Sequence, residues 1–383
     1  MKFGLMSFNH TTNLGNEIQS IAARRFLPKI DHYIDHEKLH HFDKDRDVKM
    51  IMNGWYLDCS RSWPPSDNIN PLLVSMHFTT DKKWGRRDAV ISEKSKEFFE
   101  KNGSVGCRDY HTVNFLTEND IKAHFTGCLT LTLDSGIKNL EKKDYIIINC
   151  EIFDEVYRFL KLKSDKDIYI VYQDMFPSFD KAFLKTMPDY LYNFTSFYNY
   201  KEKFFMAENL LKIYEHASCV ITDRLHCALP CLALKTPVLL LNNSRGMKER
   251  YEGLNHLLLQ CSFEEYAKNY DIFDVDNPPE NSNEYLKIRK ELIKTCKKFT
   301  GHINKSCYVE DEELIKSTEL LSKNAIETRK YFKNVLKEFN TQQDIIDKQK
   351  KEIAKQKKIV EEMKSSNSWK VTSPIRNIKN KFK

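Results

Sequence analysis

Glycine and proline are both scarce in this chain, with 11 of each among 383 residues. Each makes up about 3%, against averages of about 7% and 5%, which excludes a collagen-like, elastic or Pro/Gly-rich disordered protein. Long apolar runs are absent too, and the longest, such as 238–241 (VLLL), are far too short to span a bilayer. The start, MKFGLMSFNH, lacks the apolar segment and cleavage site of a signal peptide, so we expect a cytoplasmic protein.

Motifs that would hold a disulfide framework, a metal or a nucleotide cofactor are also missing. The ten cysteines form no C-x-x-C pair, and several lie in apolar runs, which predicts reduced and mostly buried thiols. Histidines cluster at 32, 36, 40 and 41, but without the partners of a committed zinc site we interpret them as a solvated surface. No G-x-G-x-x-G and no P-loop occurs, so nothing supports a nicotinamide or flavin cofactor.

Charge is balanced except at the C-terminal end. The chain has a net charge of +7, and residues 341–383, with twelve Lys/Arg and five Asp/Glu, carry all of that excess. A neutral body is a poor polyanion binder, so we expect no nucleic-acid partner. Residues 366–383 (SNSWKVTSPIRNIKNKFK) mix cations with apolar groups, which is typical of a segment that lies on an anionic membrane surface. A frayed basic end is the alternative.

What the chain does contain is apolar sequence, 41% of its residues, in short runs that alternate with amphipathic stretches. This alternation indicates βαβ units in two blocks, hence two doubly wound domains. We predict strands at 2–8, 48–52, 72–78, 104–107, 122–126, 145–149, 168–172, 190–194, 218–222 and 237–241. We predict helices at 16–27, 92–101, 204–216 and 226–234, with the domain boundary near 135–144.

From about residue 283 the pattern becomes helical, and we expect it to stay so. Apolar residues recur every seven positions at Phe332, Phe339, Ile346, Ile353 and Val360, but positions 342, 349 and 356 are all Gln. One apolar seam beside a polar one predicts a long solvated helix with weak homo-oligomerisation. The predicted parts of the chain are therefore two domains at 1–140 and 141–305, a helical extension at 306–365 and a basic tail at 366–383.

The segment Asn13, Leu14, Gly15, Asn16 and Glu17 follows the first predicted strand and opens a helix. Gly15 permits close approach of the backbone, and Asn16 is a good N-cap. A helix N-terminus after the first strand of a parallel sheet can bind an anion or a sugar hydroxyl. An ordinary strand–helix turn is the alternative.

Arg108 and Asp109 end the strand predicted at 104–107. An arginine at the carboxyl end of a strand points into the crevice between domains, where its fork of donors suits a carboxylate or a phosphate. A structural pair between the two residues is the alternative. His77, at the end of the third predicted strand, is a candidate for lining the same crevice.

The strand predicted at 218–222 runs into Asp223, Arg224, Leu225 and His226, the strongest signal in the chain. Arg224 and His226 are two residues apart, so we expect them on the same side, at the mouth of the second sheet. A guanidinium and an imidazole together can hold an anion and move a proton. A capped helix start with a hydrogen-bonded histidine is the alternative.

These motifs together resemble the polysaccharide pyruvyl transferase family over roughly residues 1–260. The resemblance is carried by NLGNEIQSIAARRFL (13–27), VGCRDYHT (105–112) and VITDRLHCALPCLALKTPVLLL (220–241), and its most specific part is Arg-Leu-His. The chain departs from many relatives at 126–133 (TGCLTLTL), where they have an Asp–Pro-like step. The final segment separately resembles tails of bacterial surface-polysaccharide glycosyltransferases.

The resemblance implies an α/β fold of two Rossmann-like doubly wound domains, like the GT-B glycosyltransferases, facing a central cleft, with 1–140 on the acceptor side and 141–305 on the donor side. It implies a transferase that moves a pyruvyl group from phosphoenolpyruvate to two hydroxyls of a sugar, forming a cyclic ketal. The acceptor is a surface polysaccharide or its lipid-linked precursor. No metal and no cofactor beyond the donor substrate is expected.

Roles follow for the residues that match the family's motifs. His226 is the predicted general acid/base, with a pKa near the working pH, and Arg224 is the second catalytic residue. Fixed cations suit the carboxylate and phosphate of the donor. The predicted donor-binding residues are Arg224, Arg108 and Leu225. The predicted acceptor or cleft residues are Asn13, Gly15, Asn16, Glu17, His77, Asp109 and Asp223.

Two other functions stay open on the sequence. A glycosyltransferase of GT-B type would use a nucleotide-sugar and grip its diphosphate with the second domain. A non-catalytic assembly protein is supported only by the long C-terminal helix. For an enzyme with a lipid-linked acceptor, the expected location is the cytoplasm, peripherally on the inner face of the plasma membrane.

Overall fold

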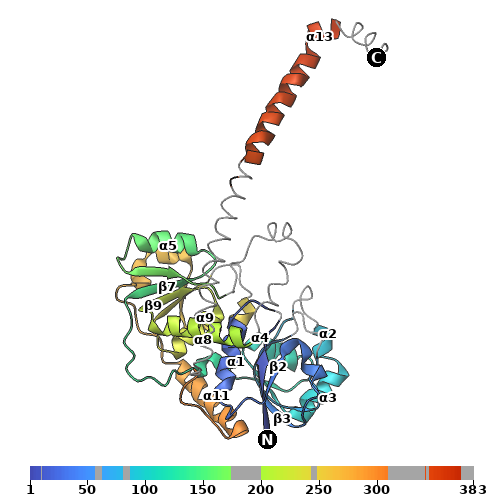
Figure 1. Ribbon diagram of the computed structural model, residues 1–383, viewed down its shortest axis with the longest axis vertical. Coiled ribbons are helices and arrows are strands. Elements are labelled where there is room, and N and C mark those ends of the chain that lie inside the picture. The colour runs from blue at the N-terminus through green and yellow to red at the C-terminus, as the bar shows by residue number, and fades with distance from the viewer. Residues whose placement is uncertain are drawn as a thin grey trace. The chain divides into compact units, whose positions relative to one another are not determined.

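The computed structural model describes residues 1–9, 11–56, 63–80, 87–173, 200–242, 248–308, 341 and 345–371. It divides into two units, Met1–Glu310 and Asp311–Lys383, and the first contains two separate sheets with helices around them (Figure 1). Every strand pairing among the described residues is parallel. The first unit is therefore built from two parallel α/β halves.

The first sheet has the strand order β2-β1-β3-β4-β5-β6. Its strands are β1 (Lys2–Ser7), β2 (His32–Asp35), β3 (Val48–Tyr56), β4 (Ile69–Phe78), β5 (Val105–Cys107) and β6 (Ala123–Phe125). Its main helices are α1 (Gly15–Arg24), α2 (Arg87–Val90), α3 (Glu93–Asn102) and α4 (Tyr110–Thr117). Two 3₁₀ turns, η1 (His36–His41) and η2 (Leu129–Thr132), belong to the same half.

The second sheet has the strand order β11-β10-β9-β7-β8. Its strands are β7 (Tyr145–Asn149), β8 (Asp167–Ile170), β9 (Cys219–Thr222), β10 (Val238–Leu241) and β11 (Leu259–Cys261). Its helices are α5 (Phe153–Lys161), α8 (Tyr200–His216), α9 (Leu225–Ala233), α10 (Phe263–Lys268) and α11 (Tyr285–Thr300). Short 3₁₀ turns are η4 (Lys248–Tyr251), η5 (Asn255–Leu257) and η6 (Tyr270–Phe273).

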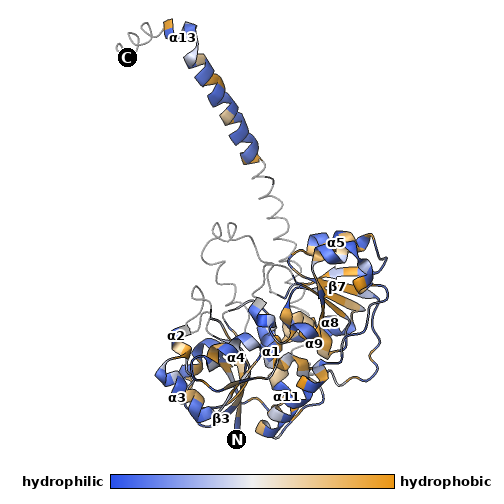
Figure 2. Cartoon of the chain, turned by 180° about the vertical axis from the view of Figure 1, so that it is seen from behind, coloured by the Kyte–Doolittle hydropathy of each residue, from blue (hydrophilic) through white to orange (hydrophobic). Residues whose placement is uncertain are grey.

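The strands are apolar because helices cover both faces of each sheet, as parallel sheets require. Residues 146–148 of β7 and all of β9 and β10 are buried, and Figure 2 shows β7 and its neighbours in the hydrophobic colour. Polar side chains therefore concentrate in the loops at the carboxyl ends of the strands. Those loops and the first turns of the helices that follow them carry nearly all of the residues that the sequence singles out for function.

One hydrophobic cluster spans both halves of the first unit. It contains Ile18 and Ile21 of α1 together with Leu211 of α8, Leu225 of α9 and Ile147 of β7, all buried. Helix α1 packs directly on α8 and α9. Domains that move independently usually meet through small and polar interfaces, whereas these two halves share one hydrophobic core.

The strands predicted within the described residues are all confirmed, while the one predicted at 190–194 lies outside them. Strands β2 and β11 are not predicted from the sequence, because they are short edge strands with weak apolar patterns. The nine described cysteines are free and buried, as predicted. No described helix has the length and apolar character needed to cross a bilayer.

The expectation of continuous helix after residue 283 is wrong. Helix α11 ends at Thr300, where Gly301 adopts a φ of 75° and donates its N–H to the Lys297 carbonyl. This left-handed conformation favours glycine and terminates the helix. The non-helical chain that follows bonds to the first half, where Asn304 N donates to Arg25 O at 2.7 Å and Cys307 N to Asp134 O at 2.7 Å.

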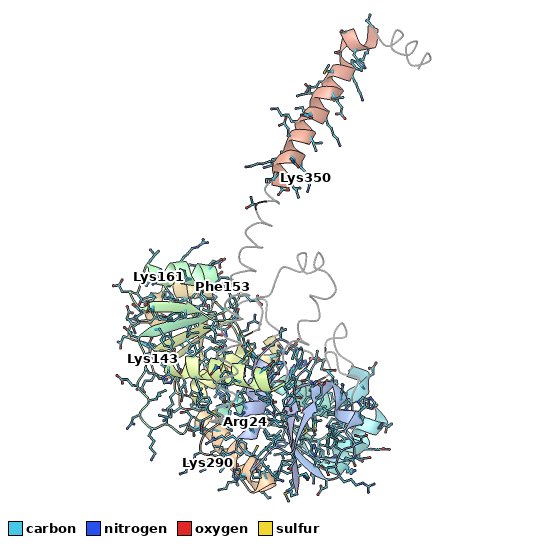
Figure 3. All side chains as sticks on the ribbon, in the orientation of Figure 1. Arg24, Lys143, Phe153, Lys161, Lys290 and Lys350 are labelled. Atoms are coloured by element: carbon cyan, nitrogen blue, oxygen red, sulfur yellow. The ribbon has the colours of Figure 1, made fainter. Side chains whose placement is uncertain are left out.

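The second unit is described only at residue 341 and at 345–371. Residues 345–365 are helical, as predicted, and a short helix α13 (Asn367–Val371) follows. Its side chains are exposed all round and largely hydrophilic (Figures 2 and 3). Ile346, Ile353 and Val360 of the predicted seam are 42%, 52% and 47% exposed, whereas Phe332 and Phe339 lie outside the described residues.

Candidate active site

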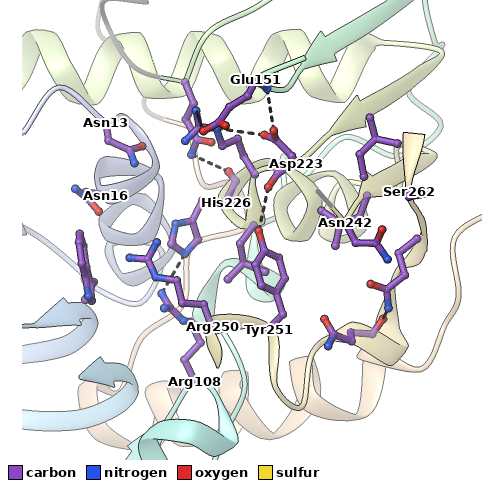
Figure 4. Close-up of a pocket in the computed structure, with 18 of the residues that line it drawn as sticks. Asn13, Asn16, Arg108, Glu151, Asp223, His226, Asn242, Arg250, Tyr251 and Ser262 are labelled. Atoms are coloured by element: carbon purple, nitrogen blue, oxygen red, sulfur yellow. Dashed lines mark hydrogen bonds and ion pairs between the residues drawn. The ribbon is translucent and has the colours of Figure 1, made fainter. Parts of the chain in front are cut away.

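A cavity of about 760 Å³ opens at the carboxyl ends of strands from both sheets (Figure 4). The first half contributes Asn13, Asn16, Trp55 and Arg108. The second half contributes Glu151, Gln173, Asp223, Arg224, Leu225, His226, Leu240, Leu241, Asn242, Arg250, Tyr251, Asn255, Gln260, Ser262 and Glu265. The carboxyl edge of a parallel sheet is where open α/β folds bind ligands, so this cavity is the candidate active site.

Arg108 and His226, predicted from separate motifs, meet inside the cavity. Arg108 Nη1 lies 3.4 Å from His226 Nε2, although 118 residues separate them in the chain. A guanidinium can only donate, so Nε2 accepts and the imidazole is neutral in this contact. Figure 4 places Arg250 beside the pair, and its guanidinium carbon lies 4.3 Å from the centre of the Trp55 ring. The guanidinium groups of Arg108 and Arg250 thus make this end of the cavity cationic, with the neutral imidazole of His226 beside them.

Arg108 is held by a buried network beneath the cavity. Its side chain is 1% exposed, its backbone N–H donates to Met76 O at 2.8 Å, and Nη1 donates to Gln19 Oε1 at 3.4 Å. Nε lies 3.6 Å from Asp109 Oδ2. These contacts orient the guanidinium toward the cavity and leave it little freedom.

Asp109 and His77 belong to that network and do not line the cavity. Asp109 caps α4 by accepting from Thr112 N at 2.9 Å, and its other oxygen lies 2.7 Å from His77 Nδ1. Burial alone would raise the pKa of Asp109, but His77 and Arg108 hold it at about 2. Burial lowers the pKa of His77 to about 4, so that imidazole is neutral. Asp109 therefore has a structural role as the cap of α4, and it also orients Arg108, which lines the cavity.

His226 differs from its predicted state. Burial, and then the charges of Arg108 and Arg250, lower its pKa well below 6.5. The expectation of a pKa near the working pH came from the residue type alone and is wrong for the free protein. This lowering of the His226 pKa cannot be predicted from the sequence, because Arg108 and Arg250 come from distant segments.

Arg224 and His226 both line the cavity, but not for the predicted reason. Strand β9 ends at Thr222, and Arg224 is the N-cap residue of α9, so neither residue follows strand periodicity. Arg224 Nε lies 3.3 Å from Asp223 Oδ1, and Nη2 lies 3.8 Å from Glu151 Oε1. Arg224 is thus paired with carboxylates of its own half, while His226 contacts Arg108 of the other half.

Asp223 lines the cavity, as predicted, and so does Leu225, whose predicted donor binding stays a prediction. Asp223 accepts from Glu151 N at 2.8 Å, and its backbone carbonyl accepts from the Tyr251 hydroxyl at 3.0 Å. Burial raises the pKa of Asp223 despite these contacts. Leu225 belongs to the shared hydrophobic cluster, so packing accounts for it in this structure.

At the start of α1, Asn13 and Asn16 line the cavity, but the predicted cap is wrong. The N-cap residue is Leu14, which makes no side-chain cap hydrogen bond, and Asn13 Oδ1 accepts from Gly15 N at 2.8 Å. A Cβ at Gly15 would lie 2.2 Å from Gln173 Nε2, so the close approach predicted for glycine is present. Gln173 Nε2 in turn donates to His226 O at 3.3 Å within the second half, and Leu14 N of the first half donates to Gln173 O at 2.9 Å, which ties the two halves together.

Glu17 does not reach the cavity. It is 1% exposed, and its Oε1 lies 2.8 Å from the Nζ of Lys203 on α8. Burial raises the pKa of Glu17 to about 7 although Lys203 opposes that shift. Glu17 therefore has a structural role in place of the predicted acceptor role. The helical pattern of the sequence does not show that its partner, Lys203, lies in the other half.

Several lining residues escaped the sequence analysis, above all Arg250, Trp55 and Tyr251. Trp55 lies at the end of β3, beyond the predicted strand at 48–52, so the rule that strand ends carry function would have found it with a better boundary. Arg250 and Tyr251 belong to η4, which follows no strand directly. Among the described residues, no group of three or more His, Cys, Asp or Glu is arranged to hold a metal.

A sequence model of the polysaccharide pyruvyl transferase family matches residues 13–245, more than half of the chain. The chain belongs to this family. The matched region contains Arg108 and the whole of 223–226, so the resemblance predicted from these motifs is confirmed. Arg250 lies just outside the region matched to polysaccharide pyruvyl transferases.

No curated protein sequence matches the chain. An uncharacterized protein from Klebsiella pneumoniae superposes with a TM-score of 0.39 and 13% identity, covering 68% of this chain and 92% of that one. A UDP-N-acetylglucosamine 2-epimerase gives 0.39 and 11%, covering 80% and 92%. The wall teichoic acid polymerase TagF gives 0.34 and 12%, covering 85% and 89%. Similarity this distant assigns no function.

Proposed function

We propose that this protein transfers a pyruvyl group from phosphoenolpyruvate to two hydroxyls of one sugar, forming a cyclic ketal. The observation that carries the proposal is the cluster of Arg108, His226 and Arg250 in the cavity of a chain that belongs to the pyruvyl transferase family. Phosphoenolpyruvate presents a carboxylate and a phosphate on one carbon. Two guanidinium groups, one of them rigidly oriented, suit that pair of anions.

His226 would act as the acid that begins the reaction. In the free protein its low pKa leaves it neutral, partly because Arg108 and Arg250 repel a proton. A bound donor brings several negative charges against those arginines and offsets their repulsion, so the pKa of His226 rises and it takes up a proton. The substrate thus prepares its own general acid.

The proposed reaction conserves every atom and proton. Protonated His226 gives its proton to the methylene carbon, the first sugar hydroxyl bonds to the central carbon, and that hydroxyl's proton returns to His226. Phosphate then leaves, the second hydroxyl bonds to the same carbon, and its proton ends on the phosphate. The products are the pyruvate ketal and hydrogen phosphate, with no net change on the protein.

Arg224 and Leu225 would complete the donor site, with Arg224 reaching the departing phosphate from the N-terminus of α9. A helix N-terminus favours negative charge, and Arg224 is a third exposed there. No cofactor beyond the donor is proposed. The proposed acceptor belongs to a surface polysaccharide or its lipid-linked precursor, and the proposed location is the cytoplasm, at the inner face of the plasma membrane.

Turnover of variants tests this proposal. Purified protein is incubated with phosphoenolpyruvate and sugar acceptors, and products are followed by released phosphate and by mass spectrometry of the ketal. His226→Gln and Arg224→Ala should each lower kcat/KM on the order of a hundredfold or more, as expected for a lost charge contact in the transition state. Arg108→Gln should mainly raise the KM for phosphoenolpyruvate.

Matched controls are Arg158→Gln on α5 and His124→Gln on β6, both exposed and outside the cavity. Normal rates in folded His226→Gln and Arg224→Ala proteins would contradict the assignment. Sugar transfer from a nucleotide-sugar without ketal formation would replace it with glycosyl transfer.

A further inference from the structure

The cavity has two ends of different electrical character. Arg108, Arg250 and His226 form the cationic end. The other end lies on the second half, and Figure 4 places Asn242 and Ser262 across the cavity from those three residues. All three carboxylates among the described lining residues, Glu151, Asp223 and Glu265, also belong to the second half.

Main-chain contacts hold the second end in shape. Asn242 follows β10, and its N–H donates to Cys261 O at 3.0 Å. Gln260 lies in β11, and its Nε2 donates to Asn255 O at 3.2 Å. Ser262 and Glu265 form a capping box at the start of α10, with Glu265 Oε2 accepting from Ser262 N at 2.7 Å. We call Asn242, Asn255, Gln260, Ser262 and Glu265 the amide end of the cavity.

The charged residues that line the cavity favour binding of the donor at one end and of the acceptor at the other. The cation nearest the second half's carboxylates, Arg224, is already ion-paired with Asp223 and Glu151. Glu265 adds a further negative charge at this end, although its Ser262 capping box and Lys268 partly offset it, so a donor with several negative charges is drawn instead to the cationic end. An uncharged sugar meets no such repulsion, and amide and carboxylate oxygens accept hydrogen bonds from its hydroxyls.

We propose that the amide end binds the acceptor sugar and that its side chains select an uncharged, polyhydroxylated ring. This inference rests on the proposed function, because it takes the cationic end as the donor site. It places the acceptor on the second half, whereas the sequence analysis expected it at 1–140. Glu265 would disfavour acidic sugars, so the substrate class is a neutral hexose or N-acetylhexosamine rather than a uronic acid.

The test removes hydrogen-bonding groups from the amide end at nearly constant volume, in the full chain, with Gln260→Leu and Asn242→Leu. Asn114→Leu, exposed on α4 and away from the cavity, is the matched control. Probes are the methyl glycosides of glucose, galactose, N-acetylglucosamine and glucuronic acid. Their binding is followed by saturation-transfer NMR, and the dissociation constant of phosphoenolpyruvate by calorimetry.

Each variant should raise the Kd of the preferred neutral glycoside roughly tenfold, because each removes about one net hydrogen bond to the sugar. The Kd for phosphoenolpyruvate should stay within about twofold, and the Asn114→Leu control should match the wild type. Glu265→Gln should improve binding of the glucuronide relative to the neutral glycosides. These results together support the acceptor site.

Three outcomes would overturn it: unchanged glycoside binding in both variants, an equal loss of phosphoenolpyruvate binding, or wild-type binding of UDP at these residues with no glycoside binding. The binding assays need no turnover. If no ketal forms with any acceptor, the proposed function fails, while loss of glycoside binding in Gln260→Leu still supports a sugar site at the amide end.

Discussion

At the residue scale, the pKa values of the histidines in and near this cavity depend on the residues around them. His226 and His77 are both neutral imidazoles with depressed pKa values, yet their surroundings differ. His226 lines the cavity beside Arg108 and Arg250, where a ligand can change the local charge. His77 is 2% exposed and hydrogen-bonded to Asp109, so no ligand reaches it. Only His226 is therefore placed to respond to substrate.

We expect the pKa of His226 to rise when an anion binds. In the free protein its imidazole should titrate well below pH 6.5, because burial and two arginines disfavour the charged form. Phosphoenolpyruvate, and more weakly inorganic phosphate, should move that titration upward by offsetting the arginine charges. Histidine NMR titrations with and without each anion measure it, and the His226→Gln spectrum assigns the signal. A titration unmoved by saturating phosphoenolpyruvate would contradict the proposed acid role.

We expect His77 to make the fold sensitive to acid. Its pKa is about 4 in the folded protein and near 6.5 when unfolded, so between these values the unfolded state binds the extra proton. The contribution to the free energy of unfolding is complete above about pH 6.5 and is lost as the pH falls toward 4. The shift corresponds to ~3 kcal/mol as an upper bound.

Urea unfolding of wild type and His77→Gln at several pH values measures this effect together with that of Asp109, whose low pKa depends in part on His77. The stability gap between them should narrow as the pH falls. A gap that is constant from pH 7 to pH 4 would show that His77 contributes no pH dependence.

At the element scale, the sequence predicts what local patterns determine. Strands β7, β9 and β10 are short apolar runs bounded by turn residues. This pattern is typical of strands in a parallel sheet that is buried on both faces. The rule that strand ends carry function found Arg108 and the segment 223–226. It did not locate the start of α1, where Leu14 is the N-cap residue without a side-chain cap and Asn13 accepts from Gly15 N, because Asn13 and Asn16 are the residue types that usually cap helices.

What the sequence could not predict depends on contacts between the halves. Arg250 lies on a 3₁₀ turn and reaches the cavity only through tertiary packing against Trp55. Lys203 reads as a polar position on an amphipathic helix, yet its side chain is 1% exposed. Its Nζ donates to the Phe8 and Thr11 carbonyls and pairs with Glu17. A lysine of α8 thus fixes the loop after β1 that carries Asn13.

We expect Lys203→Met to destabilise the protein by about 3–5 kcal/mol, because it leaves a buried carboxylate and two carbonyls without their donor. The double variant Lys203→Met/Glu17→Gln should recover part of that loss, since no unpaired charge remains. Urea unfolding at pH 8, above the Glu17 pKa of about 7, measures both. A double variant no more stable than the single one would mean that the carbonyl bonds, and not the ion pair, dominate.

At the scale of the whole molecule, the first unit does not behave as two domains that happen to touch. The cluster around Ile18 and Leu211 continues from one half into the other, and Arg24 of α1 pairs with Glu208 of α8 at 2.6 Å. The chain after α11 then returns to the first half at Arg25 and Asp134. The cationic cluster, which needs Arg108 from one half and His226 from the other, is therefore preformed. The predicted GT-B-like arrangement, in which two domains face a central cleft, stays a prediction.

The second unit invites a prediction about where the enzyme works. Residues 341–383 carry the whole net positive charge, and the described part exposes apolar groups, with Trp369 at 37% and Val371 at 77%. Each lysine or arginine near an anionic bilayer contributes about 1 kcal/mol and loses that contribution within a Debye length. The five cations at 370, 376, 379, 381 and 383, with shallow insertion of Trp369, are enough for reversible attachment.

We therefore expect salt-sensitive binding to vesicles that contain anionic lipid, lost when residues 366–383 are deleted. Co-sedimentation at low and high salt measures this, with uncharged vesicles as the control, since only the electrostatic contribution depends on salt. Turnover on a soluble methyl glycoside should survive the deletion, because every proposed catalytic residue lies in Met1–Glu310. Equal sedimentation of the full and shortened chains would contradict membrane binding by this tail. It would also remove the physical basis for placing a lipid-linked acceptor at the enzyme's active site.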